Sequence, residues 1–262
     1  MNIRLTQLDG KLPNLALMKL AAFHRERGDN IHFTRSPYRD FLETTYDRVF
    51  GSAIFSFSAD RVTALRKEFP EAIVGGTWHP DNTITVEQLV GPVRGLDYSL
   101  YPDFDASLGF ATRGCRLKCG FCLVLKMEGK PKPNSDIMHI WRGPGYPKHL
   151  HLLDNDFFGH PTWRQHIQDI QVGGFKVCFN QGINIRMIDG EVAEALASIP
   201  YYDDQFKTRR LYTAWDNIGD EGRFFKGVAI LSDAGVSPTH LLALVDTTAP
   251  LSVEQWPSFS AG

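Results

Sequence analysis

The sequence predicts an α/β protein built on parallel sheets, and two features of its pattern indicate this class. Short apolar segments that suit buried strands alternate along the chain with longer segments whose apolar residues recur at helical spacing. The links between them are short and contain glycine, proline and aspartate, which favours strand–helix–strand units with helices on the faces of a parallel sheet. The chain has 262 residues, 43% of them hydrophobic, which is enough for a substantial core in one or two domains.

A first, small doubly wound parallel sheet is predicted over residues 1–95. The start of the chain alternates apolar and polar residues, as a strand does, and the helix after it has Gly28 as a candidate C-cap. A later continuous apolar run is typical of a buried parallel strand. The expected strands cover residues 2–9, 30–34, 46–58 and 71–77, and the expected helices cover residues 15–29 and 60–70.

A linker is predicted at residues 96–106, where glycine, proline and aspartate punctuate the chain. The alternation then resumes and predicts a second domain over residues 107–262, in which the lysine- and proline-rich residues 126–136 are expected to form a loop. The tail, residues 249–262, is too rich in proline and serine to predict a further strand. The expected strands cover residues 107–114, 148–158, 175–182, 209–217 and 240–248, and the expected helices cover residues 161–174, 189–199 and 220–235.

Composition and charge limit the kinds of partner and the cellular compartment that we expect for this chain. The formal net charge of −2 argues against a broad electrostatic nucleic-acid surface. There is no run of about 18 apolar residues, so no membrane span is expected, and the first residues lack the pattern of a secretory signal. We therefore expect a cytoplasmic protein with reduced thiols, in which four cysteines indicate metal binding or catalysis sooner than disulfides.

Three of the four cysteines, Cys115, Cys119 and Cys122, lie within eight residues of one another. Thiolates bind zinc and iron–sulfur clusters, but a structural zinc site normally takes four protein ligands. Three close thiolates fit three corners of a cubane cluster and leave one iron open to an outside ligand. The fourth cysteine, Cys178, falls within a predicted strand, and we expect it to be a small core residue and not a fourth ligand.

The spacing Cys-x3-Cys-x-aromatic-Cys, placed after the first strand of an α/β run, resembles the radical SAM superfamily. The resemblance implies that the three cysteines hold a [4Fe–4S] cluster and that Phe121 is the aromatic residue of the motif. It implies that the open iron binds S-adenosylmethionine (SAM). It also implies a partial (β/α)6 barrel with the cluster at the carboxyl ends of the strands, where ligands bind in such folds.

Polar residues after the second strand of this domain are candidates for SAM binding. Many members of the family carry a glycine-rich GGE stretch at this place, which holds the SAM amino group; here the residues are Asp154, Asn155 and Asp156. Carboxylate and amide oxygens can accept hydrogen bonds from an ammonium group. The alternative is that these residues cap the following helix.

The loop after the third strand carries Asn180, Gln181, Asn184 and Arg186. An arginine can bind the SAM carboxylate with two parallel hydrogen bonds, and the amides can bind ribose hydroxyls. The alternative is a loop whose amides satisfy its own backbone. The orientation of Arg186 discriminates between hypotheses: pointing into the barrel mouth favours an active enzyme, and pointing to solvent favours a degenerate one.

Other residues near the predicted strand ends have weaker claims to a role. Arg113 and Lys118 flank the cysteines and are candidates for tuning cluster charge, or are plain solvated residues. Trp215 and the two polar residues after it could face substrate or adenine, although Trp215 is expected to pack in the core or at its rim. His149 and His151 form no ligand pattern and are expected to be structural or solvent-facing.

The first domain resembles the Rossmann-type domain that precedes the barrel in cobalamin-dependent radical SAM proteins. That domain usually carries Asp-x-His-x-x-Gly, whose histidine binds cobalt; this chain has Asp9 at the corresponding place but no histidine. We therefore expect a degenerate domain used for substrate positioning or packing, with base-off cobalamin as the alternative. The pair Gly75-Gly76 is not a GxGxxG fingerprint, so NAD binding has little support.

The resemblance thus implies an enzyme that cleaves SAM to a 5′-deoxyadenosyl radical, which abstracts hydrogen from an unknown substrate. An electron donor such as flavodoxin or ferredoxin is implied as partner. Five strands are counted where the family's barrel has six, so either the barrel is truncated or it closes with a partner. The competing hypotheses are a zinc-binding structural or regulatory module and a truncated, degenerate radical SAM-like protein without turnover.

Overall fold

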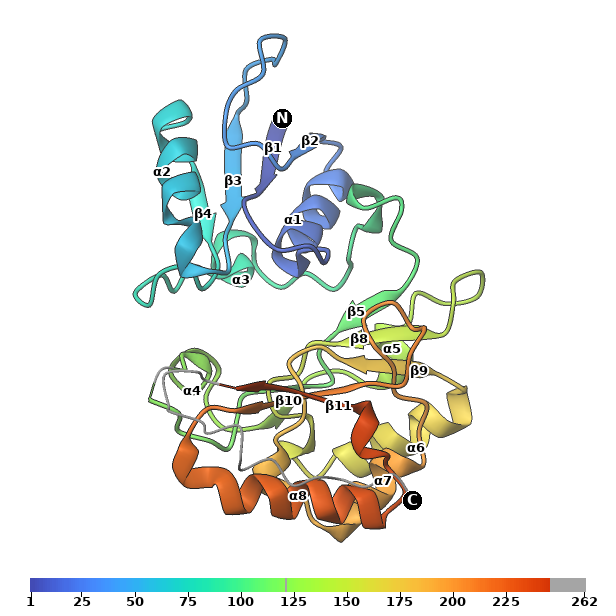
Figure 1. Ribbon diagram of the computed structural model, residues 1–262. Helices are drawn as coiled ribbons and strands as arrows, with labels where there is room; N and C mark the ends of the chain where they lie inside the picture. Colours follow the sequence, from blue (N-terminus) through green and yellow to red (C-terminus); the bar gives the residue numbers. More distant parts are fainter. Residues whose placement is uncertain (121, 246–262) are drawn as a thin grey trace. The chain divides into compact units, whose positions relative to one another are not determined.

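The computed structural model describes residues 1–120 and 122–245, and the chain divides into two compact units, Met1–Asp105 and Ala106–Gly262 (Figure 1). Both units combine helices with parallel strands, which confirms the predicted α/β class. Among the described residues, no helix has the length and apolar character needed to span a membrane.

The first unit contains a four-stranded sheet with the order β2-β1-β3-β4, and every pair in it is parallel. Its innermost strand, β1, is buried at nearly every position, whereas the edge strand β2 is largely accessible. The strands are β1 (Asn2–Gln7), β2 (Asn30–Thr34), β3 (Arg48–Ser52) and β4 (Ile73–Gly75). The helices are α1 (Leu15–Glu26), α2 (Ala59–Glu68) and α3 (Val86–Val90), with short 3₁₀ turns at Ser56–Ser58 and Tyr98–Leu100.

A buried arginine ties the loop after β2 to this sheet. Arg4, in the middle of β1, has no exposed side-chain surface and forms an ion pair with Glu43. Its guanidinium also donates to the carbonyl oxygens of Ser36 and Tyr38, both at 2.9 Å, and lies 4.7 Å from the centre of the Phe69 ring. These contacts satisfy a charge that would otherwise be costly to bury, so the strand tolerates an arginine inside the core.

Strand β3 is shorter than the predicted strand at residues 46–58, because the chain turns directly after it. Both oxygens of Asp9 accept from the backbone N–H of Ile54, at 2.8 and 2.9 Å, and one also accepts from Phe55 at 2.9 Å. These bonds divert the backbone into a 3₁₀ turn. Asp9, which matches the aspartate of the cobalamin motif, therefore has an internal partner in the turn after β3.

Most of the predicted linker at residues 96–106 belongs to the first unit, and Tyr101 explains why. Its side chain is buried, its hydroxyl donates to Gln7 at 2.9 Å, and it accepts from the backbone N–H of Asn14 at 3.1 Å. Burial raises the pKa of Tyr101 to about 12. The segment is thus packed into the first unit through a polar anchor that composition does not reveal.

Replacing Tyr101 with phenylalanine is expected to lower the free energy of unfolding of the first unit by about 1–2 kcal/mol. The reason is that the buried N–H of Asn14 loses its acceptor and the side chain of Gln7 loses a donor. Urea unfolding measures this change, and Tyr38→Phe is the matched control because Tyr38 is 59% exposed. Equal stability of the two variants would contradict the anchoring role.

The second unit contains a three-stranded parallel sheet with the order β5-β8-β9 and a parallel pair, β10-β11. A short antiparallel pair, β6-β7, lies outside both. The strands are β5 (Ser107–Gly109), β6 (Thr112–Arg113), β7 (Lys132–Pro133), β8 (His149–Leu152), β9 (Lys176–Phe179), β10 (Leu211–Trp215) and β11 (Leu241–Val245). The helices are α4 (Val124–Glu128), α5 (Ile137–Ile140), α6 (Trp163–Gly173), α7 (Gly190–Ala197) and α8 (Glu221–Asp233).

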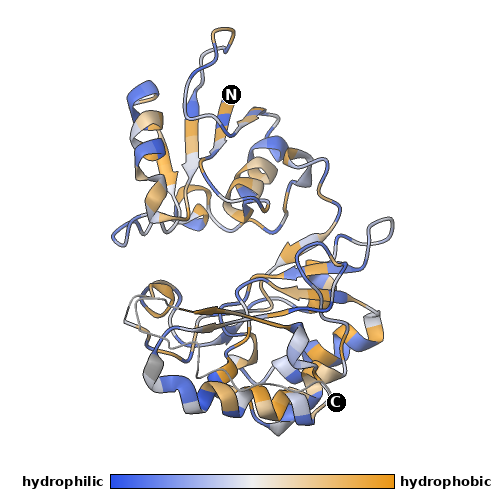
Figure 2. Ribbon diagram, in the orientation of Figure 1, coloured by the Kyte–Doolittle hydropathy of each residue, from blue (hydrophilic) through white to orange (hydrophobic). Residues whose placement is uncertain are grey.

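Helices α6, α7 and α8 lie on one side of these strands, and one continuous core of buried apolar residues joins them (Figure 1). Strands β10 and β11 are hydrophobic along most of their length (Figure 2). Strand pairing stops at β9 and begins again at β10, so the described strands form two parallel sheets and no closed barrel. The predicted tail at 249–262 lies outside the described residues.

The strand predicted at residues 107–114 is interrupted. Strand β5 leaves the sheet after Gly109, and the chain pairs again only at β6, with β7 as its partner. Between them, the backbone N–H groups of Ala111 and Thr112 are taken by the side chain of Asp154 instead of by a neighbouring strand. The region predicted as a loop at 126–136 accordingly holds the end of α4 and all of β7.

Candidate functional site

The three clustered cysteines lie in one loop, which runs from the end of β6 to the start of α4. The base of this loop is narrow: Cys115 donates its backbone N–H to the carbonyl oxygen of Gly129 at 3.2 Å. Gly114 has φ of +89°, and a Cβ there would lie 2.4 Å from the carbonyl oxygen of Lys130. Only glycine fits at this position, because the backbone at the start of the loop packs directly against the backbone of Lys130.

All three thiols are free; those of Cys115 and Cys119 are half-buried and that of Cys122 is exposed. Burial raises the pKa of Cys115, the N–H of Leu117 at 3.4 Å opposes this, and negative charge at Asp156, Cys122 and Cys119 raises the pKa further. Cys115 therefore lies near enough to Cys119 and Cys122 for their charge to affect its pKa. Phe121, the aromatic residue of the motif, is outside the described residues.

The donor types in this loop fit an iron–sulfur cluster, but they are not arranged as a finished site. Within residues 1–120 and 122–245, no three histidine, cysteine, aspartate or glutamate side chains converge as metal ligands. Metal sites built on thiolates are rarely preformed without their metal, because ligation and ordering of the loop are coupled. Two cations, Arg116 within the loop and Arg186 beside it, can offset the charge of three thiolates.

Asp154 holds the strand that leads into the cysteine loop. Its side chain is 3% exposed and accepts from the backbone N–H groups of Ala111 and Thr112 and from the hydroxyl of Thr112 at 2.8 Å. Burial raises the pKa of Asp154 to about 6, although each of these hydrogen bonds opposes the shift. The carboxylate predicted to bind SAM thus has three internal donors and anchors the entry to the loop.

Asp156 and Asn155 also attach the loop to the end of β8. Asp156, only 4% exposed, accepts from the backbone N–H of Arg116 at 3.0 Å and pairs with its guanidinium through both carboxylate oxygens, at 2.9 and 3.0 Å. Asn155 donates to Glu128 at 3.4 Å, and Glu128 in turn accepts from the backbone N–H of Gly114 at 2.9 Å. The acidic stretch therefore serves as a support for the loop on both of its sides.

Arg186 reaches the cysteine loop from the 3₁₀ turn Ile185–Met187, after β9. One guanidinium nitrogen lies 3.9 Å from the sulfur of Cys119, and another lies 2.8 Å from the carboxylate of Asp220. Partial burial acts to lower the pKa of Arg186, but the hydrogen bonds to Asp220 and Cys119 outweigh it, and the pKa is raised. The side chain is 19% exposed and faces the cysteines, not bulk solvent.

The three amide residues of the same loop are placed differently from one another. Asn180 interacts with the ring nitrogen of His151 at 3.0 Å, and Gln181 is exposed. The carbonyl oxygen of the Asn184 side chain lies 3.5 Å from Arg186. The amide nitrogen of Asn184 is buried and has no hydrogen-bond partner among the described residues. Asn184 is therefore the amide closest to Arg186 with a donor still unused.

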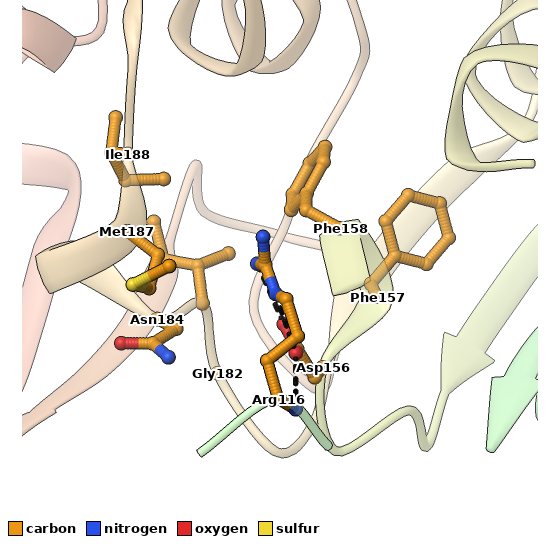
Figure 3. A pocket seen from close by; sticks show the side chains of 9 residues that line it. Arg116, Asp156, Phe157, Phe158, Gly182, Asn184, Met187 and Ile188 are labelled. Atoms are coloured by element: carbon orange, nitrogen blue, oxygen red, sulfur yellow. Dashed lines mark hydrogen bonds and ion pairs between the residues drawn. The ribbon is translucent and has the colours of Figure 1, made fainter. Parts of the chain in front are cut away.

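A narrow pocket with room for little more than one water molecule adjoins this region (Figure 3). Arg116 and Asp156 lie in its middle, joined by their ion pair, with the phenylalanines on one side and Asn184 on the other (Figure 3). The pocket thus offers charged, amide and aromatic groups together. Its lining comprises Arg116, Asp156, Phe157, Phe158, Gly182, Ile183, Asn184, Met187 and Ile188.

The remaining sequence candidates lie away from the cysteines or have structural contacts. Cys178 has no exposed surface, and burial raises the pKa of its thiol to about 12, so it is a core residue as predicted. Trp215 is buried and stacks on Phe224 at 5.3 Å. Arg113 pairs with Glu128 at 2.7 Å, and Lys118 is exposed.

Sequence reasoning missed three residues of the site: Arg116, Glu128 and Asp220. Arg116 lies between two of the cysteines, so its position in the motif was a usable signal. Glu128 and Asp220 act through contacts 14 and 34 residues away along the chain, with Gly114 and Arg186. No local pattern marks such pairs.

Gly227→Ala is expected to displace Arg186 and to lower the stability of the second unit by about 1–3 kcal/mol, as overpacking does. A Cβ at Gly227 would lie 2.2 Å from the carbonyl oxygen of Ile185, so α8 and the turn that carries Arg186 must separate. Gly222→Ala on the same helix is the matched control, because nothing lies within 4 Å of its added Cβ. Urea unfolding of both variants tests this; equal effects would contradict the close packing.

Neither a protein-family model nor a curated protein sequence matches this chain. A functional interpretation therefore depends on the geometry of the site and on the cysteine spacing.

Proposed function

We propose that the chain is a radical SAM enzyme whose cluster is held by Cys115, Cys119 and Cys122. The observation that carries the proposal is the approach of Arg186 to the sulfur of Cys119, from a loop 67 residues later in the chain. This contact supports a site in which the cysteine loop and the carboxyl end of β9 act together. Arg186 faces Cys119 and not bulk solvent, which favours an active enzyme over a degenerate one.

The fold supports the same proposal at a coarser level. Strands β5, β8 and β9 follow one another in one parallel sheet, and β10 and β11 form a parallel pair. We propose that these five strands correspond to a partial (β/α)6 barrel, with the cysteine loop after its first strand. The acidic stretch and the Arg186 loop directly follow β8 and β9, and the cysteine loop follows β5 after the short strand β6. All three therefore lie beyond the carboxyl ends of strands that are parallel in one sheet.

When bound, a cluster would pass one electron from an external donor to SAM and so supply the reductive cleavage to methionine and a 5′-deoxyadenosyl radical. The residues of the chain have supporting tasks. Arg116 and Arg186 offset the negative charge of the thiolates, and Asp154, Asp156 and Glu128 hold the loop. Since Asp154 and Asp156 are hydrogen-bonded to the loop, Asn184, whose side-chain nitrogen has no partner among the described residues, becomes the better candidate for contact with SAM.

The first unit is proposed to be a degenerate domain used for substrate positioning or packing. Asp9 is the residue that matches the cobalamin motif, and its two oxygens are bonded to the turn after β3. This engagement favours a degenerate domain over one that holds cobalamin. Binding of cobalamin to the full chain, followed with a radioactive label or by absorption, tests whether the first unit is degenerate. Stoichiometric binding would overturn this proposal.

The deciding experiment for the second unit is anaerobic iron–sulfur reconstitution, followed by visible absorption and an assay for 5′-deoxyadenosine under reducing conditions. A cluster together with SAM cleavage would establish the chemistry and leave the substrate to be identified. A cluster without cleavage would favour the degenerate alternative. A colourless protein that retains zinc would overturn the proposal in favour of a zinc module.

A further inference from the structure

We propose that Arg186, held in place by Asp220, is a tuning residue that donates to the Cys119 sulfur and raises the reduction potential of the cluster. This inference rests on the proposed function. It assigns to Arg186 a role toward the protein's own ligand sulfur, distinct from the binding of the SAM carboxylate that the sequence predicts. The two roles differ in one respect that can be measured: only the first exists when SAM is absent.

The geometry gives Arg186 two partners at once. One terminal nitrogen of its guanidinium is 2.8 Å from Asp220, and the other terminal nitrogen is 3.9 Å from the Cys119 sulfur. Its third nitrogen lies 3.5 Å from the side-chain oxygen of Asn184. The planar guanidinium is thus oriented on two further sides while it faces the sulfur, as suits a rigid fork of donors.

The ion pair between Asp220 and Arg186 is buried enough to persist in salt. Its side chain is 15% exposed and that of Arg186 is 19% exposed, so the pair is screened less than a surface ion pair. Asp220 begins the helix α8, whose Gly227 packs against the turn that carries Arg186. Asp220 and the close helix packing therefore hold Arg186 from two directions.

The expected consequence follows from how iron–sulfur potentials are set. Net charge near the cluster and hydrogen bonds to its sulfurs both affect the cost of adding an electron. Three thiolates make that addition costly, and a guanidinium that donates to one ligand sulfur reduces the cost. Arg116 is less suited to this role, because its guanidinium is already paired with both oxygens of Asp156.

Arg223 provides a matched control. It also lies beside Asp220, at 3.5 Å, but its side chain is 76% exposed. Arg223→Gln therefore removes the same charge from the same carboxylate while leaving the contact of Arg186 with Cys119 in place. A general effect of charge on the unit would appear in both variants, and an effect through the sulfur would appear only at Arg186.

The test compares wild-type, Arg186→Gln, Arg186→Lys and Arg223→Gln full-length chains, each reconstituted anaerobically and titrated without SAM while the reduced cluster is followed by electron paramagnetic resonance. We expect a lower midpoint potential for Arg186→Gln, an intermediate one for Arg186→Lys, and one close to wild type for Arg223→Gln. If Arg186→Gln and Arg223→Gln shift equally, or if neither shifts, the inference is overturned. If Arg186→Gln fails to hold iron, Arg186→Lys measured against Arg223→Lys decides by the same criterion.

The failure of this inference is distinguishable from failure of the proposed function. A wild-type chain that takes up no iron would overturn the proposed function and this inference together. A wild-type cluster whose potential is the same in Arg186→Gln, combined with weaker SAM binding by that variant, would overturn only this inference and return Arg186 to the SAM carboxylate.

Discussion

Replacing any one of Cys115, Cys119 and Cys122 with alanine is expected to reduce iron uptake to background and to abolish SAM cleavage. In the proposed site each residue would supply one of three protein ligands, so no other ligand could replace the one that is lost. The measurement is iron and sulfide content per chain after anaerobic reconstitution, together with visible absorption. Because the thiols lie in a loop and none is fully buried, the variants are expected to fold.

Cys178→Ala is the control for this experiment. Cys178 lies within β9 and is fully buried, and its truncation removes a small apolar group from the core without touching the cysteine loop. We expect this variant to bind iron as the wild type does, with a modest loss of stability. Iron uptake that depends on Cys178 as much as on the other three would contradict the three-cysteine site and favour four-thiolate metal binding.

Asp154→Ala is expected to lower the free energy of unfolding of the second unit by roughly 3–5 kcal/mol. The substitution leaves the N–H groups of Ala111 and Thr112 buried without an acceptor, and each such group costs about 1–3 kcal/mol. Urea unfolding followed by tryptophan fluorescence measures the change. Asp233→Ala, at the exposed end of α8, is the control and is expected to stay within about 0.5 kcal/mol of wild type.

The raised pKa of Asp154 also predicts how the stability of the second unit changes with pH. The pKa of Asp154 rises from 3.8 to about 6 on folding, because burial disfavours the charged form. The folded unit therefore holds this proton more tightly than the unfolded chain between these values. The contribution of the group to stability is complete below pH 4 and is lost as pH rises through about 6.

Asp154→Asn isolates that contribution, since asparagine does not titrate. The stability of the wild type minus that of Asp154→Asn is expected to fall by up to roughly 3 kcal/mol between pH 4 and pH 7, at about 1.4 kcal/mol per pKa unit. A difference that stays constant would show that the hydrogen bonds to Asp154 cancel the effect of its burial, and one that rises with pH would show that they outweigh it.

The sequence was informative where side-chain pattern alone decides structure. Alternation and apolar runs located the cores of the strands that became β1, β2, β8, β9 and β10, and of the helices between them. It was misleading where a side chain distant in sequence accepts hydrogen bonds from backbone N–H groups that a strand would otherwise use. Asp9 ends β3 early, and Asp154 interrupts the strand predicted at 107–114. A pattern within one segment carries no record of such partners.

The site shows the same division. The cysteine spacing and the polar loop with Arg186 could be read from the chain, because each is a local motif. The engagement of Asp154 with the strand before the cysteines could not, since a carboxylate at a strand end suits an anchor and a ligand equally well. The role of Asp220 depends on a turn and a helix that meet through Gly227, which only the packing reveals.

The hydrogen bonds that hold the cysteine loop determine how much of the chain is needed to reproduce the loop in another protein. Its supports come from the loop's own far end, through Glu128, and from residues after β8, through Asp154 and Asp156. A synthetic peptide spanning only the cysteines would carry the three thiols without the acids that hold the loop. The smallest part of the chain that could be grafted onto another scaffold is therefore discontinuous. It comprises the cysteine loop as far as Glu128 and the residues that follow β8.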